Sequence, residues 1–407
     1  MKNDITKINV EKIQEIWGKV QQNLGEQIKP RIMIGGKTGV GKSSLLNSIL
    51  GSDAYEVGVI PTTRENIEKI WSSSAGDIVV IDSPGFGEAE SDNVELSDEN
   101  ELIRKIEKLN AHIFILVIKA DDRSLELEQG FLKMWNDSEN LSGIPLIIAV
   151  NQIDKITPVR VWEPKSLDLK LPRTEKEKNI KKYLEYLGNI NYFQDKFVEK
   201  KLIPVSAGES ANDPMKYGIN DLRRSIYLSL PDSAKTVFAR SAKLRNHEAR
   251  RIIRNYSIAC SAAVTANFMP TSDALILAPI QVAMILHLGK LYKIEVTKSL
   301  AASLLSSIGL TLSGRLGAQF IISLIPGIKN IVGPVLAFNL TYTIGNIISS
   351  IFSENKLSIS KDEIAELAKK YFEDAKAAGE KLLDMSKDPT IKDDYEHIEE
   401  DDGANNE

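Results

Sequence analysis

The sequence predicts a mostly parallel sheet with helices on both faces, followed by an all-α apolar domain. Apolar runs of strand length alternate with helical patterns between residues 31 and 230, as in an α/β sheet covered on both sides. A glycine-rich loop joins the first apolar run to the first helical pattern. Charged residues then become sparse from 257 to 353, where Ala, Ser, Gly, Leu and Ile dominate.

Length and composition set the outer limits of the interpretation. The chain has 407 residues and a formal net charge of −5, so its overall charge gives no reason to expect nucleic-acid binding. Its single cysteine, Cys260, cannot form an intramolecular disulfide, which fits a reducing compartment. The N-terminal stretch is charged and polar and has no apolar signal region. We therefore expect a cytoplasmic protein.

Shifts in composition divide the chain into six segments. The first has helical spacing of apolar residues and ends near Pro30, and the last is too acidic and too poor in apolar residues to fold, so we expect disorder there. The predicted segments are 1–29, an amphipathic helix; 30–232, the α/β domain; 233–256, a basic helical linker; 257–353, the apolar helical domain; 354–386, an amphipathic helix; and 387–407, an acidic tail.

Within these segments the apolar pattern predicts individual elements. The candidate strands are Arg31–Ile34, Ile78–Ile81, Ile113–Ile118, Leu146–Val150 and Leu202–Val205. The apolar domain has four helical patterns, near 257–267, 273–292, 296–323 and 330–352. Two of its stretches, FMPTSDALILAPIQVAMILHLG and LIPGIKNIVGPVLAFNLTYTIG, are alike in the placement of Pro and Gly. They are either related helical hairpins or a chance likeness between apolar segments.

The loop GKTGVGKS matches G-x-x-x-x-G-K-[ST] between a strand and a helix, which is the context of a phosphate-binding loop. Its glycines let successive N–H groups converge on a phosphate, and the following helix adds partial positive charge. Lys42 supplies a full charge to the β- and γ-phosphates, and the Ser43 hydroxyl is the expected Mg²⁺ ligand. The loop residues expected to contact the nucleotide are Gly36, Lys37, Thr38, Gly39, Val40, Gly41, Lys42, Ser43 and Ser44.

Polar residues at two later strand ends indicate which nucleotide the loop holds. In IVVIDSPGFGE the strand ends at Asp82, whose carboxylate can reach Mg²⁺ through water, and the Gly85 N–H can sense a γ-phosphate. In PLIIAVNQIDKI the strand is followed by Asn151 and Asp154. Asp154 can accept hydrogen bonds from N1–H and N2–H₂ of guanine, donors that adenine lacks, so the carboxylate selects guanine.

A third strand end completes the predicted site. LIPVSAGES places Ser206, Ala207 and Gly208 where a backbone N–H can meet guanine O6. Each short motif is weak alone, but all follow predicted strands, and ligands bind at that edge of an open α/β sheet. The sequence therefore predicts that GTP or GDP binds with Mg²⁺.

From about Arg31 to Leu230 the chain resembles a translation-factor-class GTPase domain of the Era-like and septin/dynamin-like kind, which implies an α/β P-loop GTPase fold. VIPTTRE resembles the first switch of that group, which implies that Thr63, or as second choice Thr62, binds Mg²⁺. The resemblance places catalysis on Lys42, Thr63 and Gly85. NQIDKITPVRVWEP is similar to a stretch in bacterial GTPases, some with a YcjF-type hydrophobic C-terminal domain, which MPTSDALILAPIQVAMI and LIPGIKNIVG also resemble.

The chain departs from this family pattern at three positions. Gln152 stands where the guanine motif usually has lysine, so we expect loss of a charge and of phosphate-loop contacts. Phe86 stands where many relatives have the glutamine that orients water, so we expect slow hydrolysis unless a partner, a second protomer or another loop supplies the missing group. Gly39 replaces the asparagine of potassium-activated relatives, so we predict no potassium dependence.

Three interpretations of residues 257–353 stay open. Uncharged stretches such as Asn330–Ser353, and the basic segment Lys235–Arg254 upstream, favour membrane insertion. Interruptions such as Asp273 and His287 favour a soluble bundle, because no segment is a clean apolar span. A domain that switches between packed and exposed states is the third.

The sequence thus predicts a slowly hydrolysing GTP switch that controls the helical domain through membrane association or self-assembly. One alternative is a structural GTPase that holds nucleotide at an oligomer interface and hardly turns it over. A weaker alternative is an Era-like, ribosome-associated role, although no basic, aromatic-interleaved RNA surface is visible. The expected partners are guanine nucleotide, a second copy bound through the α/β domain, and a membrane bound through 257–353, in the cytoplasm or at the inner face of the cell membrane.

Overall fold

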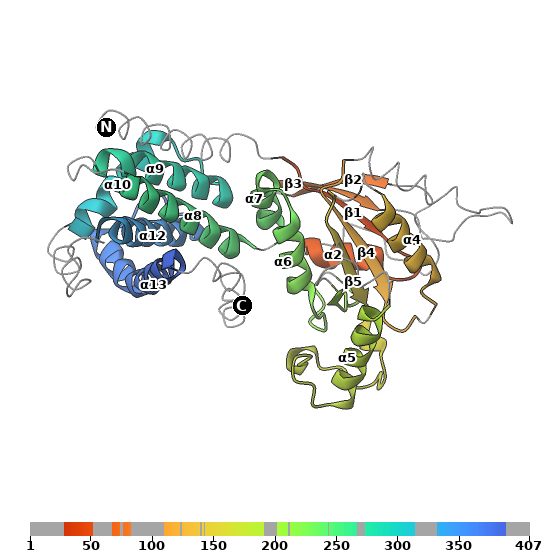
Figure 1. Cartoon of the computed structure of the whole chain (residues 1–407). Helices are drawn as coiled ribbons and strands as arrows, with labels where there is room; N and C mark the ends of the chain where they lie inside the picture. The colour runs from red at the N-terminus through yellow and green to blue at the C-terminus, as the bar shows by residue number, and fades with distance from the viewer. Residues whose placement is uncertain are drawn as a thin grey trace. The chain divides into compact units, whose positions relative to one another are not determined.

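The computed structural model divides into two compact units, which we call the α/β unit (27–244) and the helical unit (245–407 together with 1–26) (Figure 1). Most of the predicted N-terminal helix and nearly all of the acidic tail lie outside the described residues. The structure describes residues 28–51, 67–73, 76–82, 110–122, 124–138, 141, 143–190, 202–210, 212–242, 244–266, 273–313 and 332–387.

The α/β unit is built on a six-stranded sheet with the strand order β2-β3-β1-β4-β5-β6 (Figure 1). Among the described strands only the edge strand β2 is antiparallel, so the predicted mostly parallel sheet is confirmed. All five predicted strands are present, and β2 was not predicted. The strands are β1 Arg31–Gly35, β2 Ile67–Ser73, β3 Gly76–Asp82, β4 Ile113–Lys119, β5 Leu146–Asn151 and β6 Leu202–Pro204.

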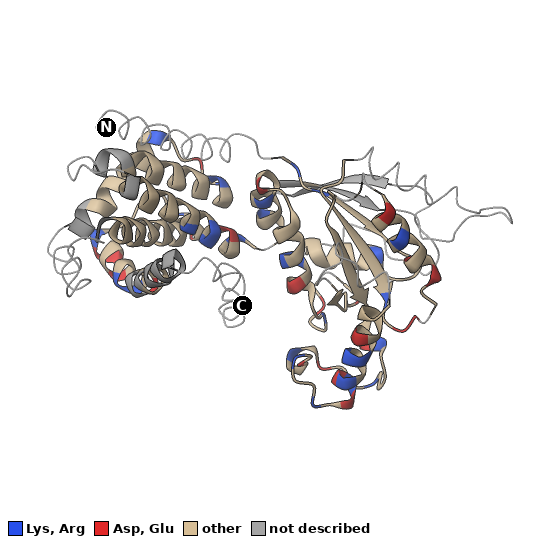
Figure 2. Ribbon diagram, viewed as in Figure 1, with Lys and Arg blue, Asp and Glu red and all other residues tan. Residues whose placement is uncertain are grey.

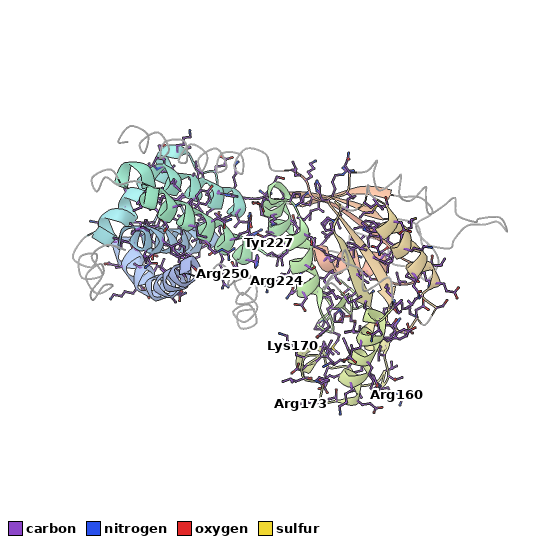
Figure 3. All side chains as sticks on the ribbon, in the orientation of Figure 1. Arg160, Lys170, Arg173, Arg224, Tyr227 and Arg250 are labelled. Carbon is purple, nitrogen blue, oxygen red and sulfur yellow. The ribbon has the colours of Figure 1, made fainter. Side chains whose placement is uncertain are left out.

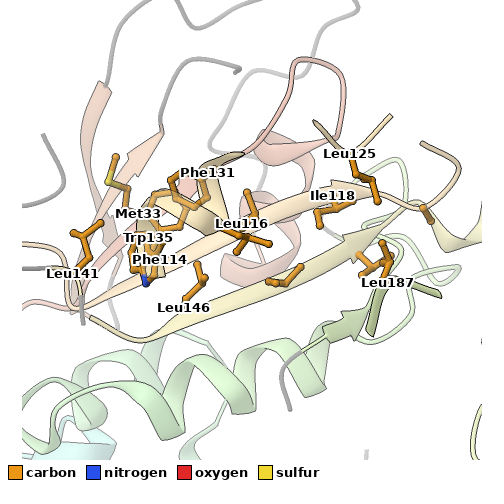
Figure 4. Packing of buried hydrophobic residues seen from close by; sticks show 14 of the residues in the cluster. Met33, Phe114, Leu116, Ile118, Leu125, Phe131, Trp135, Leu141, Leu146 and Leu187 are labelled. Carbon is orange, nitrogen blue, oxygen red and sulfur yellow. The ribbon is translucent and has the colours of Figure 1, made fainter. Parts of the chain in front are cut away.

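Helices cover both faces of this sheet, as predicted. One face packs against α4 and α5, where the rings of Phe114, Phe131 and Trp135 lie 5.1–5.5 Å apart between β4 and α4 (Figure 4). The other helices include α6, which packs against α2 and β5, and α7, which packs against β3. The helices are α2 Lys42–Leu50, α4 Glu126–Asp137, α5 Glu175–Gly188, α6 Ile219–Ser229 and α7 Asp232–Ser241, with short 3-10 turns η1 Ile153–Lys155 and η2 Pro164–Ser166.

β4 and β5 are buried along almost their whole length because they lie in the middle of the sheet between the two helical layers. This explains why their sequences are continuous apolar runs instead of alternating patterns. The edge strand β2 carries Glu68 and Lys69 and pairs only with β3. Charged residues of this kind are common on edge strands, where they discourage pairing with another chain.

The helical unit is an all-α bundle, as predicted. Its described helices are α8 Arg245–Ala266, α9 Asp273–Tyr292, α10 Lys298–Ser313, α12 Val332–Ser353 and α13 Lys361–Lys387. α12 packs against α8, α9 and α13, and a Cβ on Gly345 of α12 would lie 2.8 Å from the Ile253 side chain of α8. The sequence placed a single linker at 233–256, whereas the structure assigns α7 to one unit and α8 to the other.

Charge is distributed unevenly over the helical unit. α12 has no charged residue, whereas α13 carries both signs along its length (Figure 2). Among the described residues one stretch, Pro334–Ser353, is long and apolar enough to cross a membrane, yet 61% of it is buried inside the bundle. Core helices of soluble proteins pass the same test, so this stretch supports membrane insertion only weakly.

Candidate functional site

The glycine-rich loop lies between the end of β1 and the start of α2, and its backbone needs glycine at two positions. Gly36 and Gly41 have φ of 145° and 89°, values that other residues rarely adopt. A Cβ on Gly36 would lie 2.3 Å from the Val117 carbonyl oxygen, and one on Gly41 would lie 2.6 Å from Asn151 Nδ2. The loop is therefore folded tightly against β4 and β5, as a loop that presents its N–H groups to a ligand requires.

The first turn of α2 is suited to an anion. Its N-cap, Gly41, makes no side-chain capping bond, and no acidic residue occupies the first turn. The N–H groups at the helix start can therefore bind a ligand, and the helix dipole favours a negative one. Lys42 begins the helix, and its Nζ donates to the carbonyl oxygens of Gly36 (3.0 Å) and Lys37 (3.3 Å). These bonds hold the lysine over the loop.

Asn151, at the end of β5, joins the glycine-rich loop to a second loop. Its side chain is 1% exposed. Nδ2 donates to the Val40 carbonyl at 2.8 Å, and Oδ1 accepts from the Ala207 N–H at 3.2 Å. Ser48 of α2 also holds this second loop, because its Oγ donates to the Ala207 carbonyl at 2.6 Å. The predicted phosphate loop and the predicted guanine loop are therefore one connected site.

Gln152 and Asp154 lie beside this connection. Gln152 has a φ of 63° and donates from Nε2 to the Gly39 carbonyl at 3.1 Å. The prediction that glutamine here loses contact with the phosphate loop is therefore wrong, because its amide reaches the same loop without a charge. The Asp154 carboxylate accepts a bond from Ser206 Oγ at 2.7 Å, which fixes one of its two oxygens. The contact of this carboxylate with the N1–H and N2–H₂ groups of guanine stays a prediction.

Two buried cations that the sequence did not predict hold the backbone next to the site. Lys176 of α5 is 2% exposed and donates to the carbonyl oxygens of Asp154 (2.6 Å) and Ile156, and burial lowers its pKa. Arg223 of α6 donates to the carbonyl oxygens at the end of α2. Both positions read as ordinary surface charges in a helical pattern, so local sequence offered no signal for them.

Gly208 continues the second loop with a φ of 69°, and a Cβ there would lie 2.7 Å from the Asp213 side chain. The Asp213 carboxylate accepts from the N–H groups of Glu209 (2.7 Å) and Met215 (2.8 Å), and these bonds lower its pKa. Trp162 Nε1 donates to the Met215 carbonyl at 2.9 Å. It belongs to a lobe between η1 and α5 on which Arg160 also lies (Figure 3).

Only some of the predicted magnesium ligands lie in the described part of the chain. Ser43 stands beside Lys42, and Asp82 ends β3 directly opposite Ile34 of β1, so both lie at the edge of the sheet where the loop begins. A hydroxyl and a carboxylate are oxygen donors of the kind that Mg²⁺ prefers. Among the described residues, no group of three or more His, Cys, Asp or Glu side chains could hold a metal ion. The other predicted residues, Thr62, Thr63, Gly85 and Phe86, lie outside the described residues.

Comparison with known families agrees with this geometry. Residues 31–152 match the family model described as "50S ribosome-binding GTPase". The α/β unit has the P-loop GTPase fold. Residues 235–351 match a model described only as a domain of unknown function, DUF697. The match to the first model covers the glycine-rich loop and Asn151, and the second covers most of the helical unit.

Curated relatives of the P-loop GTPase domain include Era proteins. The chain is 29% identical to GTPase Era of Geobacter sp. over 204 residues, which are 49% of this chain and 55% of that protein. It is 32% identical over 177 residues to the tRNA modification GTPase MnmE of Acetivibrio thermocellus, covering 40% of this chain and 37% of that protein. The chain thus spans about half the length of these relatives or less.

Two solved structures are also similar to part of this chain. A probable GTP-binding protein engB is 24% identical, with a TM-score of 0.34, over 49% of this chain and 97% of that one. Era in complex with MgGDPNP and part of 16S ribosomal RNA is 21% identical, with a TM-score of 0.33, over 60% of this chain and 70% of that one.

Proposed function

We propose that the P-loop GTPase domain binds GTP and GDP and slowly hydrolyses GTP, and that the bound nucleotide controls the helical unit. The observation that carries this proposal is the Asn151 side chain, which bonds the phosphate loop at Val40 and the second loop at Ala207. A nucleotide bound across this bridge would have its phosphates at the N–H groups of the loop and its base at the Asp154 carboxylate. Guanine offers that carboxylate two N–H donors, and adenine offers none.

Each group has a distinct part in this proposal. The loop N–H groups and the start of α2 bind the phosphates, and Lys42 neutralises charge that develops on them during hydrolysis. Ser43 and Thr63, with Asp82 through water, would hold Mg²⁺, which supplies charge neutralisation at the β- and γ-phosphates when bound. Asn151 holds the two loops in register, and Asp154 selects the base. Gly85 would report the presence of the γ-phosphate.

Hydrolysis is proposed to be slow in the isolated chain because Phe86 cannot orient water. Water must attack the γ-phosphorus to give GDP and inorganic phosphate, and a polar group from a partner or a second copy would have to position it. The test is phosphate release from GTP and from ATP at several protein concentrations. GTP turnover that rises with protein concentration supports completion between protomers. Turnover of ATP at equal or better efficiency would refute the guanine assignment.

A second candidate function is a structural GTPase that binds nucleotide but hardly hydrolyses it. Phe86 favours this candidate, because no polar catalyst follows the D-x-x-G motif. Tight GDP and GTP binding without phosphate release at any protein concentration would establish it. A matched Phe86→Gln variant sharpens the comparison, because the restored glutamine should raise turnover only if the remaining catalytic groups are in place.

The output of the switch is proposed to be a change in membrane contact or self-association of the helical unit. Its apolar composition and its long uncharged helix α12 support this proposal. Flotation with liposomes and sedimentation without them, each in GTP-analogue, GDP and nucleotide-free states, would distinguish the two outputs. Protein that neither floats nor changes its sedimentation with nucleotide would refute both.

A further inference from the structure

The side chain of Lys37, the second residue of the phosphate loop, bonds to residues that follow β4 in the chain. Its Nζ lies 2.9 Å from Asp122 Oδ2 and 3.0 Å from Glu128 Oε2, and it also donates to the Ser124 carbonyl. These three partners belong to the segment that joins β4 to α4 and to the first turn of α4. The lysine therefore ties the loop to an element that lies about ninety residues further along the chain.

The ion pairs of Lys37 with Asp122 and Glu128 lie mostly out of the solvent. The Glu128 side chain is 0% exposed and that of Lys37 is 18% exposed. Burial raises the pKa of Glu128, whereas the hydrogen bonds of Lys37 to both carboxylates outweigh its own burial and raise the pKa of the lysine. A carboxylate buried to this degree is costly unless a cation accompanies it. Lys37 thus stays ionised and in place.

Asp122, the first carboxylate partner of Lys37, is fixed by hydrogen bonds of its own. The Asp122 Oδ1 accepts from the Ser124 N–H at 2.9 Å, which closes a tight turn. Tyr183 of α5 donates its hydroxyl to the carbonyl oxygens of Asp122 (2.9 Å) and Lys119 (3.2 Å). The anchor point of Lys37 is therefore fixed to the core of the domain on two sides.

The backbone of the same lysine bonds the phosphate-binding lysine. The Lys37 carbonyl accepts from Lys42 Nζ at 3.3 Å. We propose that Lys37 is a positioning residue for Lys42: its side chain, clamped between Asp122 and Glu128, fixes the loop carbonyl that orients the Lys42 ammonium toward the β- and γ-phosphates. This inference rests on the proposed nucleotide site, and it predicts that the clamp acts on phosphate binding and not on base recognition.

The test measures the dissociation constants of GDP and of inosine diphosphate, which lacks the guanine amino group, for the full chain. The variant Lys37→Met alone would leave Glu128 buried without its cation, and that could unfold the domain. The decisive variant is therefore the double substitution Lys37→Met with Glu128→Gln, which removes both charges. Lys37→Arg is the conservative variant, because a guanidinium can pair with both carboxylates.

We expect the double variant to bind GDP about tenfold more weakly, close to 1.4 kcal/mol, while the ratio of the two dissociation constants stays unchanged. Lys37→Arg should bind GDP as the wild type does. The matched control is Lys133→Met, which removes an exposed lysine of α4, the helix that carries Glu128, and should leave GDP binding unchanged.

Two results would overturn the inference. A folded double variant with wild-type affinity for GDP would mean that Lys37 only neutralises Glu128. A changed ratio between inosine diphosphate and GDP would mean that the clamp acts on the base. If the wild-type chain binds no GDP at all, the proposed nucleotide site itself has failed, and that failure is visible before any variant is compared.

Discussion

The substitution Asp154→Asn should invert the base preference of the site from guanine to xanthine. Asp154 is predicted to accept hydrogen bonds from the N1–H and N2–H₂ groups of guanine. Ser206 Oγ already donates to its Oδ1 at 2.7 Å. In the variant this bond would keep the amide oxygen in the place of Oδ1, so the amide nitrogen would take the place of Oδ2. A donor would then face a donor of guanine, whereas xanthine has a carbonyl oxygen at that position.

The expected size of the effect follows from these two bonds. Hydrogen bonds to a charged group contribute about 1.5–3 kcal/mol each, so losing one and weakening the other costs roughly 3–5 kcal/mol. That corresponds to a loss of about 10²–10⁴ in GDP affinity. The carboxylate lies at the edge of the sheet and Ser206 is retained as its partner, so we expect little change in the unfolding midpoint.

The assay is competition between GDP, xanthosine diphosphate and a fluorescent guanine nucleotide. The matched control is Asp168→Asn, since Asp168 Oδ1 accepts only from backbone N–H groups of its own turn and an amide oxygen can do the same. GDP affinity within threefold of the wild type in Asp154→Asn, or loss of GDP without a gain in xanthosine diphosphate, would show that the base does not bind at this carboxylate.

Three further predictions concern other parts of the chain. Gly41→Ala should abolish GDP binding, because its Cβ would lie 2.6 Å from the Asn151 amide at a φ of 89°; wild-type affinity by calorimetry would contradict the loop geometry. Gly345→Ala should destabilise the helical unit by about 1–3 kcal/mol through overpacking, whereas Gly309→Ala, which faces open space, should be neutral or stabilising by up to about 1 kcal/mol in the same urea titration. Burial lowers the pKa of His287 from 6.5 to about 4, so between these pH values the unfolded chain binds a proton at this residue and the folded chain does not. Stability should therefore fall by roughly 3 kcal/mol between pH 7 and pH 4 from this group, and His287→Gln should flatten that part of the profile.

The α/β unit could be predicted well because the same local pattern, an apolar run followed by polar residues, marks both a strand and its end at the site. β4 and β5 are buried on both faces, so they appear in the sequence as continuous apolar runs, and the polar residues that follow them lie at the ligand edge of the sheet. β2 lacks that signal, because its sequence IEKIWSS mixes charged and polar residues with a few apolar ones, as an edge strand can. It was therefore missed although its pairing with β3 is regular.

The contacts that hold the site together could not be predicted, because each joins residues far apart in the chain. Asn151 reads as a base-selecting residue, yet its side chain bonds to Val40 and Ala207. Lys37 is predicted only as a nucleotide contact of the loop, yet its side chain pairs with the buried Glu128. Spacing in a sequence shows which residues share an element, whereas these bonds depend on how the elements pack.

The two similar stretches of the apolar domain gain one structural observation. Each ends in a glycine that lies in α9 or α12 at a close approach. A Cβ on Gly289 would lie 2.6 Å from the Val296 side chain, and one on Gly345 would lie 2.8 Å from that of Ile253. Close packing at both positions gives a physical reason for glycine at the same place in each stretch. It does not depend on the two stretches having a common origin.

The packing of α12 limits how the nucleotide could act on the helical unit. Exposing the large buried side chains of this helix would cost about 9–18 kcal/mol, at about 1.5–3 kcal/mol for each of the six. These side chains are Phe338, Ile344, Ile347, Ile348, Ile351 and Phe352. Coupling between two sites typically supplies about 1–3 kcal/mol, so exchange of GDP for GTP cannot by itself extract α12.

A bilayer could replace the lost contacts, but it would do so in every nucleotide state. Nucleotide-dependent flotation would therefore indicate that the surface of a closed bundle meets the membrane. Hydrogen exchange on the floated protein tests this directly. If the α12 amides stay protected and the α12 side chains stay inaccessible to a lipid-phase quencher, the bundle has stayed closed. Quenching at α12 positions in the GTP-analogue state alone would show that the nucleotide does extract the helix, and would refute this energetic reasoning.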